Sequence, residues 1–277
     1  MDTNAHELDF GFQTVPLNSW VGDENGGPMV MLHGVLRNGG CFAPLLAGLG
    51  ARHEVHALDL RGHGRSRAGR GYRVVDYVPD VIRYLRTEVC GPAVLYGHSL
   101  GAMLSAAVAA AEPRLVKAIV MEDPPFHTMG ERMMGTPLQD YFEKIAGFAG
   151  SCLGTAELAR ELAEMRVGAP RDATTWRFLA SSLRHVRPEV LEPIVAGKWM
   201  DGYPMEDVFR GVRCPALLMQ CDGAVGGMLT DEDACAFVEL AADCTLSVLR
   251  GVGHQAHWMA TGEVLRRTLE FVGSLEG

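Results

Sequence analysis

The pentapeptide Gly97-His98-Ser99-Leu100-Gly101 holds a serine between two glycines, in the pattern Gly-x-Ser-x-Gly. It follows the apolar run 93–96 and precedes the alanine-rich stretch 102–111, so the pattern predicts a strand, a sharp turn and then a helix. Such a turn presents the serine at a helix N-terminus, where developing negative charge is favoured. A Cβ at either glycine would collide with the adjoining strand or helix. Ser99 is therefore the candidate nucleophile for attack on an acyl carbon.

A serine hydroxyl is too weak an acid to ionise near neutral pH, so Ser99 needs a histidine that accepts its proton. The chain has ten histidines. His254 ends the loop Gly251-Val252-Gly253-His254, which follows the apolar run 246–249. We predict that His254 is this general base and then the general acid, with His257 as the alternative.

Two further segments of the chain also place polar residues directly after a strand-like run. His33-Gly34 closes the apolar run 29–32, and the loop 59–66, which reads DLRGHGRS, follows the strand-like segment 54–58. Together with the serine pentapeptide and the loop of His254, they resemble the α/β-hydrolase family over residues 15–271. The resemblance implies an α/β fold: a mostly parallel, eight-stranded sheet flanked by helices, with a helical lid inserted after strand six. It also implies hydrolase activity that needs no cofactor.

The acid that orients His254 has two candidate positions in this family. The more usual one follows the seventh strand, where Asp222 stands two residues earlier than the family pattern expects. The other follows the sixth strand, where Glu122 and Asp123 end the predicted strand 118–121. The spacing of Asp123 from Ser99 resembles the branch that contains some lactone and amide hydrolases. We predict Asp123 as the acid, with Asp222 as the alternative and Glu122 behind both.

The resemblance also implies an oxyanion hole made of two backbone N–H groups. Leu100 supplies one of them, and Val35, the residue after His33-Gly34, supplies the other. Arg37 and Asn38 stand in the same loop. They either face the pocket or serve as a solvated charge and a helix N-cap, and we favour the second interpretation.

The chain outside the site follows a strand–helix alternation typical of a parallel sheet with helices on both faces. This alternation stops between residues 124 and 211, where helical stretches are interrupted by glycine and proline. We therefore predict a core domain of residues 1–124 and 208–277 and a helical lid of residues 125–207. Substrate contacts are expected from residues of the lid and of the two catalytic loops, namely Phe126, Met129, Trp176, His33, Gly34 and His257. Four lid arginines are candidates for a carboxylate clamp, although solvated surface is the favoured interpretation for most of them: Arg171, Arg177, Arg184 and Arg187.

Composition narrows the class of partner. The 277 residues are 48% hydrophobic and carry a formal net charge of −9, which argues against nucleic acid and against anionic membrane surfaces. No apolar run approaches the ~20 residues of a membrane span. Seven cysteines without metal-ligand spacing favour free thiols in the cytoplasm. No set of metal ligands and no phosphate-binding loop is present in the sequence. We expect a monomer or homodimer that acts on a small molecule without a metal or cofactor.

The expected activity is cleavage of a carboxylic ester, lactone or amide of a small organic substrate through an acyl-enzyme. The same serine and histidine also suit cleavage of a carbon–carbon bond or transfer of the acyl group. A third alternative is a non-catalytic protein that keeps the fold and binds a small molecule. The intact pair of Ser99 and His254 argues against pure binding.

Overall fold

The computed structural model describes residues 14–165 and 172–275. Its centre is a seven-stranded sheet in the order β1-β3-β2-β4-β5-β6-β7, in which only the pair β1–β3 is antiparallel. The expectation of an α/β fold with a mostly parallel sheet is confirmed. The described residues contain seven strands of this sheet and not the expected eight. The strands are β1 (Asn18–Val21), β2 (Pro28–Leu32), β3 (Glu54–Asp59), β4 (Ala93–His98), β5 (Val116–Glu122), β6 (Ala216–Cys221) and β7 (Cys244–Leu249).

The inner strands are apolar on both faces, as expected of a sheet covered by helices on two sides. Every residue of β4 and β6 is buried. Alternate residues of a strand point to opposite faces, and β4 follows this rule: Leu95 packs into one hydrophobic cluster and Tyr96 into the other. The sheet therefore forms a rigid support whose strand ends lie at fixed positions.

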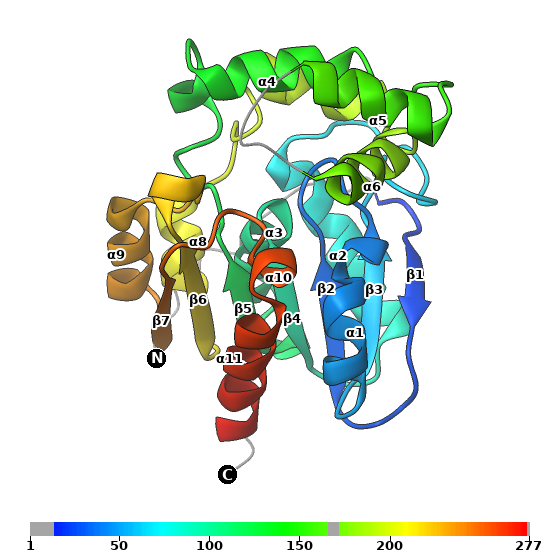
Figure 1. Cartoon of the computed structure of the whole chain (residues 1–277). Coiled ribbons are helices and arrows are strands. Elements are labelled where there is room, and N and C mark those ends of the chain that lie inside the picture. The colour runs from blue at the N-terminus through cyan, green and yellow to red at the C-terminus, as the bar shows by residue number, and fades with distance from the viewer. Residues whose placement is uncertain (1–13, 166–171, 276–277) are drawn as a thin grey trace.

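Helices cover both faces of this sheet (Figure 1). On one face, α2 packs against α3, α3 against α8, and α8 against α9. On the other face, α1, α10 and α11 pack against one another. None of the described helices is both long and apolar enough to cross a membrane. The helices are α1 (Ala43–Gly50), α2 (Val74–Glu88), α3 (Leu100–Ala111), α4 (Pro137–Ala146), α5 (Thr155–Glu164), α6 (Ala173–Leu183), α7 (Glu192–Val195), α8 (Met205–Gly211), α9 (Asp231–Leu240), α10 (Ala256–Met259) and α11 (Thr261–Ser274).

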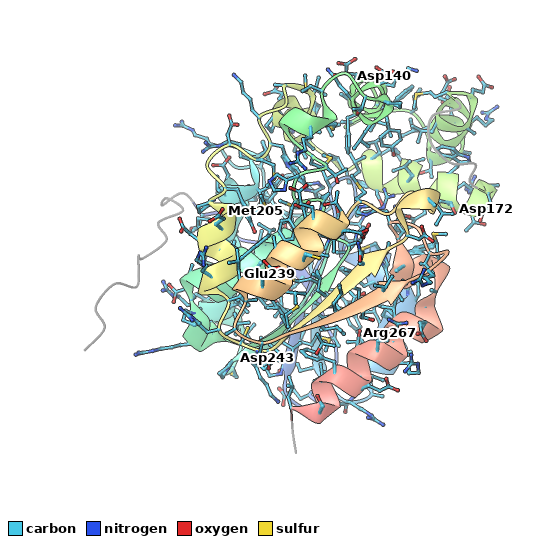
Figure 2. All side chains as sticks on the ribbon, turned by 90° about the vertical axis from the view of Figure 1, so that its left-hand side faces the viewer. Asp140, Asp172, Met205, Glu239, Asp243 and Arg267 are labelled. Atoms are coloured by element: carbon cyan, nitrogen blue, oxygen red, sulfur yellow. The ribbon has the colours of Figure 1, made fainter. Side chains whose placement is uncertain are left out.

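A helical segment joins β5 to β6 and contains α4 to α8. It follows the fifth strand of the described part of the chain, not the sixth. Helices α4, α5 and α6 lie above the carboxyl ends of the strands (Figure 1). The side view agrees, since it places Asp140 of α4 at the top and Asp243, just before β7, at the opposite edge (Figure 2). Helix α8 belongs to the same segment but packs on α3 of the core. Helices α4 to α6 are therefore the part of the segment that lies over the strand ends (Figure 1). The division of the chain at residues 125 and 207 stays a prediction.

Candidate active site

The turn between β4 and α3 holds Ser99 in a strained backbone conformation, with φ 54° and ψ −116°. Only residues packed tightly on all sides keep such angles. A Cβ on Gly97 would lie 2.2 Å from the carbonyl oxygen of Gly101, and one on Gly101 would lie 1.8 Å from that of Leu32. The prediction that both glycines are needed for steric reasons is confirmed. Leu100 is the first residue of α3, so its N–H has no acceptor within the helix.

His254 follows β7 and meets a carboxylate that follows β5. Its Nδ1 donates a hydrogen bond to Oδ2 of Asp123 at 2.6 Å. Since Nδ1 carries the proton in this bond, Nε2 is left as the acceptor that a serine hydroxyl requires. The Asp123 side chain is fully buried, and its backbone has a positive φ of 49°. Three backbone N–H groups hold this carboxylate in place, from Cys221, Met228 and Leu229.

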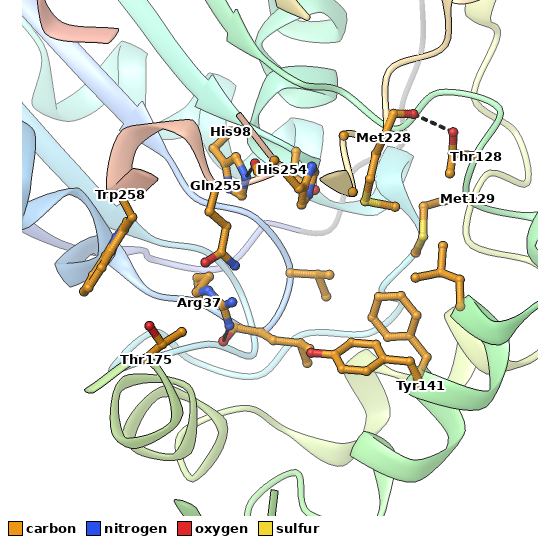
Figure 3. Close-up of a pocket in the computed structure, with 18 of the residues that line it drawn as sticks. Arg37, His98, Thr128, Met129, Tyr141, Thr175, Met228, His254, Gln255 and Trp258 are labelled. Atoms are coloured by element: carbon orange, nitrogen blue, oxygen red, sulfur yellow. Dashed lines mark hydrogen bonds between the residues drawn. The ribbon is translucent and has the colours of Figure 1, made fainter. Parts of the chain in front are cut away.

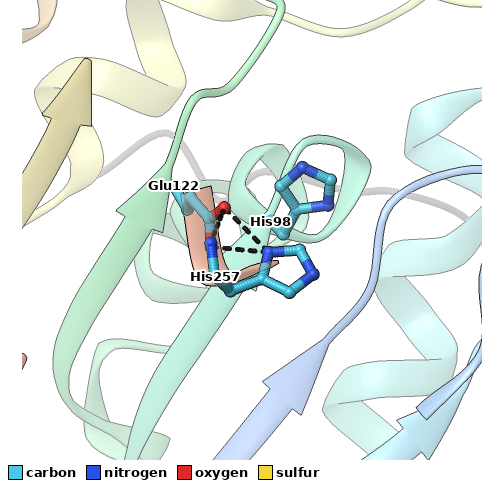
Figure 4. A group of neighbouring side chains, drawn as sticks. All are labelled: His98, Glu122 and His257. Atoms are coloured by element: carbon cyan, nitrogen blue, oxygen red, sulfur yellow. Dashed lines mark hydrogen bonds and ion pairs between the residues drawn. The ribbon is translucent and has the colours of Figure 1, made fainter. Parts of the chain in front are cut away.

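Glu122, which precedes Asp123 at the end of β5, binds His257, which follows His254 by three residues. Glu122 accepts hydrogen bonds from both the backbone N–H and Nδ1 of His257, at 3.0 and 2.8 Å (Figure 4). Burial alone would raise the pKa of Glu122, but His257 and His98 beside it lower that pKa to about 2. His98 donates from Nε2 to the backbone oxygen of His254 at 2.8 Å. Glu122 and His257 thus bond to each other, and neither takes part in the bond between Asp123 and His254. The roles of alternative acid and alternative base stay predictions.

Asp222, the alternative acid, has a different set of partners. Its two carboxylate oxygens accept from the backbone N–H groups of Ala224 and Gly251, at 2.9 and 2.8 Å. These bonds to Gly251 and Ala224 lower the pKa of Asp222. Asp222 thus ties the loop after β6 to the loop after β7, and the structure brings Asp123, not Asp222, to His254.

The loop after β2 passes directly beside the serine turn. A Cβ on Gly34 would lie 2.8 Å from Nδ1 of His98 and 3.0 Å from Cβ of Ser99. The loop then turns through Leu36, whose φ is 67°. Asn38 accepts from the N–H of Gly40 and caps the short helix 39–42, which confirms the N-cap interpretation of that residue.

A cavity of about 950 Å³ opens over this turn, and both Ser99 and His254 line it (Figure 3). Val35 lines it as well, so the predicted nucleophile, base and one oxyanion-hole residue share one space. Helices α4 and α6 form the far wall. Further lining residues include Met129, Leu138, Tyr141, Phe142, Thr175, Phe178, Trp199, Met228, Gln255, Trp258 and Met259.

Of the six predicted substrate contacts, only Met129 lines this cavity. Phe126 packs between Phe209 and Phe237, with a centroid distance of 4.6 Å to Phe209. Trp176 lies on the buried side of α6, which turns Thr175 and Phe178 to the cavity instead. Those two predictions are wrong as pocket contacts, because each aromatic ring is part of the hydrophobic core.

The loop residues predicted to contact substrate also serve the interior. The ring of His33 is fully buried: Leu60 N–H donates to its Nε2 at 2.9 Å, and its Nδ1 donates to Gly34 O at 2.8 Å. His257 is held by Glu122. Gly34 touches the serine turn and does not line the cavity. These three residues position the catalytic loops and do not contact the pocket space.

Sequence reasoning missed the polar end of the cavity. Arg37 is buried and lines the pocket, so its interpretation as a solvated charge is wrong. Gln255 and Trp258 follow His254 closely in the chain, and this proximity was the available signal for them. Of the four clamp candidates, Arg177, Arg184 and Arg187 do not line the cavity, and Arg171 lies outside the described residues.

His98, Glu122 and His257 form the one group of side chains in residues 14–165 and 172–275 whose donor atoms are close enough to share a metal ion. The oxygens of Glu122 already accept from His257 and from the hydroxyl of Tyr96. These bonds account for the cluster without an ion, and we assign no metal to it. The expectation of a cofactor-free enzyme stays a prediction.

Two buried histidines near the catalytic loops make stability dependent on pH. Burial lowers the pKa of His33 to about 4 and that of His63 to about 3, below the usual 6.5. Between these values and pH 6.5 the unfolded chain binds protons that the native rings exclude, so stability falls as pH falls. Each ring contributes a slope of about 1.4 kcal/mol per pH unit. We expect the free energy of unfolding, measured with denaturant at pH 7, 6 and 5, to decline by about 3 kcal/mol per unit from these two rings, and more steeply with the contribution of His98, whose pKa burial also lowers.

The measurement stops at pH 5 because the lowered pKa of Glu122 withdraws stability only below its usual value of 4.5. The variant His63→Gln removes one of the two rings and should flatten the slope. A free energy of unfolding that is constant from pH 7 to pH 5 would show that these rings do not resist protonation.

The sequence is similar to known proteins over most of its length. A model of the alpha/beta hydrolase family matches residues 29–267. A 2-(acetamidomethylene)succinate hydrolase from Mesorhizobium japonicum is 41% identical over 121 residues, which cover 43% of this chain and only 42% of that protein. A pimeloyl-[acyl-carrier protein] methyl ester esterase from Chromobacterium violaceum is 34% identical over 73% of this chain and 78% of its own length.

The solved structures show the same fold. The crystal structure of an E-2-(acetamidomethylene)succinate hydrolase superposes with a TM-score of 0.74 at 24% identity, covering 93% of this chain and 95% of the other. A structure described as a marine microorganism esterase gives a TM-score of 0.75 at 20% identity, over 93% and 99% of the two chains. With the family model matching most of the sequence, this chain belongs to the alpha/beta hydrolase family and is an enzyme of that family.

Proposed function

We propose that the protein is a serine hydrolase that cleaves a carboxylic ester, lactone or amide of a small organic substrate through an acyl-enzyme. One observation carries the proposal: His254 donates to the buried Asp123 at 2.6 Å and lines the same cavity as the strained Ser99. Nucleophile, base and orienting acid thus come from the ends of three different strands. This is the arrangement in which a histidine activates a serine.

In the first half-reaction, Nε2 of His254 takes the proton of Ser99 as its Oγ attacks the acyl carbon. The carbonyl oxygen becomes negative, and the N–H groups of Val35 and Leu100 stabilise it. The loss of one such donor typically costs about 3 kcal/mol of transition-state stabilisation. His254 then gives its proton to the leaving alcohol or amine, and the acyl group stays on Ser99.

In the second half-reaction, water replaces the leaving group. His254 takes a proton from the water as its oxygen attacks the acyl carbon, and then returns a proton to Ser99 as the acid departs. Asp123 remains ionised throughout and stabilises the imidazolium that forms in each half-reaction. The backbone N–H groups that hold its carboxylate keep it in position for this role.

Among the bonds that this chemistry can break, an ester is the first to test. The relative from Chromobacterium violaceum is named as a methyl ester esterase, and it aligns with 73% of this chain. That name supports the class of bond and not the substrate, because the lining of the cavity decides the substrate.

The test is covalent labelling by an uncharged, serine-directed phosphonate, followed by peptide mass spectrometry. We expect one adduct per chain, located on Ser99, and a pre-steady-state burst of p-nitrophenol when the unlabelled enzyme meets p-nitrophenyl acetate. The variant Ser99→Ala is the control and should take no label. An adduct on any other residue, or none with the burst absent, would contradict the proposal.

A further inference from the structure

The cavity over Ser99 has two chemically different ends (Figure 3). At one end, Met129 and Met228 lie close together, and this end is suited to an apolar group. At the other end, Arg37 lies near Gln255, Thr175 and Trp258. His254 stands between the two ends, so a substrate at Ser99 can reach both.

Arg37 lies in the wall of the cavity, where its positive charge interacts with a bound substrate. Its side chain is only 7% exposed, although it lines the cavity. It follows Val35 by two residues, so it belongs to the loop that we propose stabilises the oxyanion. Its N–H donates to Gly34 O at 3.2 Å, and its Nη1 donates to Leu36 O at 3.3 Å. These bonds fix the stem of the side chain in the strained turn through Leu36.

The surroundings of Arg37 strengthen an interaction with an anion. Phe178 and Trp258 pack with their rings tilted, at a centroid distance of 4.7 Å, and Nε1 of Trp258 donates to Cys41 O at 2.7 Å. Both rings line the cavity, Trp258 at the same end as Arg37, and Arg37 itself is buried. A charge pair in such a place is weakly screened, whereas the amide of Gln255 and the hydroxyl of Thr175 can add neutral hydrogen bonds.

The remaining charged side chains of the cavity that belong to helices stand at its exposed rim. Lys144 and Asp140 on α4 are exposed, as is Asp172, which caps α6 through the N–H of Thr175. Figure 2 shows Asp140 on the outer side of this helical segment. Water screens these rim charges strongly. Among the described charged side chains of the lining, Arg37 is a buried cation, and one guanidinium suits one carboxylate.

We propose that Arg37 binds a carboxylate of the substrate, and that the enzyme therefore prefers short esters or amides that carry a free carboxylate on the acyl side. The inference rests on the proposed function, since it names the substrate class of the same site. The planar guanidinium presents parallel N–H donors that fit the two oxygens of a carboxylate. A phosphate monoester carries more negative charge than this single cation matches, so the structure favours the carboxylate.

The experiment compares matched methyl esters, whose leaving group is too poor for the free carboxylate of the same molecule to expel it, and follows the acid released by titration at constant pH. The monomethyl esters of succinic and glutaric acid are each measured against the neutral methyl ester of the unbranched acid with the same number of carbons. We expect the wild type to show a higher kcat/KM for the acidic member of each pair. In Arg37→Met, which keeps the length of the stem, the acidic-to-neutral ratio should fall by about 10- to 100-fold.

Two further variants separate charge from loop structure. Arg37→Lys keeps the charge without the fork and should restore part of the ratio. Arg177→Met makes the same replacement on α6, at an exposed arginine outside the cavity, and should leave the ratio unchanged. If Arg37→Met lowers kcat/KM equally for both members of a pair, Arg37 positions the oxyanion loop and the carboxylate site is wrong.

The failure of this inference is distinguishable from failure of the proposed function. If Ser99 is labelled and neutral esters are cleaved, but the wild type shows no preference for acidic esters, the hydrolase stands and the carboxylate site falls. If Ser99 is inert, the carboxylate site is tested by the affinity for a ligand instead of by cleavage. Calorimetry with monomethyl glutarate and Ser99→Ala should then show binding that the added Arg37→Met weakens by about 10-fold or more. Equal affinity in both proteins would overturn the proposal.

Discussion

Ser99→Ala should lower kcat for p-nitrophenyl butyrate by about 10⁶-fold while the protein stays folded. The hydroxyl supplies the nucleophile, and no other group in the cavity is placed at the strained turn to replace it. Alanine keeps the Cβ and has the same steric limits as serine at φ 54°, so the backbone strain is nearly unchanged. Initial rates on freshly purified protein, with circular dichroism and denaturant unfolding beside them, measure both halves of this expectation.

The matched control removes a buried hydroxyl in α3, six residues after Ser99. Ser105 Oγ donates to Gly101 O at 2.9 Å, and the side chain is fully buried. Ser105→Ala should cost about 1 kcal/mol of stability and leave kcat intact. If instead Ser99→Ala retained the wild-type rate on every ester that the wild type cleaves, Ser99 would not be the nucleophile.

The parts of the site that were predictable from the sequence are those set by local geometry. The serine turn requires two glycines within five residues, because a Cβ at Gly97 or Gly101 meets backbone atoms within about 2 Å. The strand and helix on either side follow from the apolar and alanine-rich runs around them. Such constraints act between neighbours in the chain, and a single sequence displays them directly.

The choice between Asp123 and Asp222 as the acid that orients His254 does not follow from such local constraints. Both follow a strand, and both lie near His254 in the fold. What separates them is the course of the loop after β6, which turns the carboxylate of Asp222 to Gly251 and leaves that of Asp123 facing the imidazole. This difference depends on contacts between segments about 100 residues apart, which spacing alone does not determine.

The substrate contacts failed for a related reason. Aromatic residues of the inserted segment were expected to line the pocket because of their type, yet Trp176 and Phe126 face the core. The period of a helix shows which residues share a face but not whether that face meets the core or the cavity. Arg37 shows the converse, since a charged residue in a loop is normally solvated and here is buried in the wall of the cavity that Ser99 also lines.

Asp123→Asn should lower kcat by about 10⁴-fold, the loss that this change causes in the best-studied serine triad. An amide has one oxygen where the carboxylate has two, and both carboxylate oxygens of Asp123 accept from N–H donors. If the amide nitrogen faces His254, the ring must present its unprotonated Nδ1 and lose Nε2 as the base. If it faces the backbone instead, it opposes N–H groups and costs stability. Rates and unfolding curves of the same preparation separate these two effects.

Asp222→Asn is the matched change, made on an aspartate that also accepts two N–H groups but does not touch the imidazole. It loosens the tie between the loops after β6 and β7 and should leave kcat within a small factor of the wild type. The pair of variants therefore isolates the contact with His254 from the general effect of replacing an acceptor by a donor. Equal losses in both variants would mean that loop order, and not the tautomer of His254, governs the rate. A larger loss in Asp222→Asn would assign the orienting acid to the loop after β6.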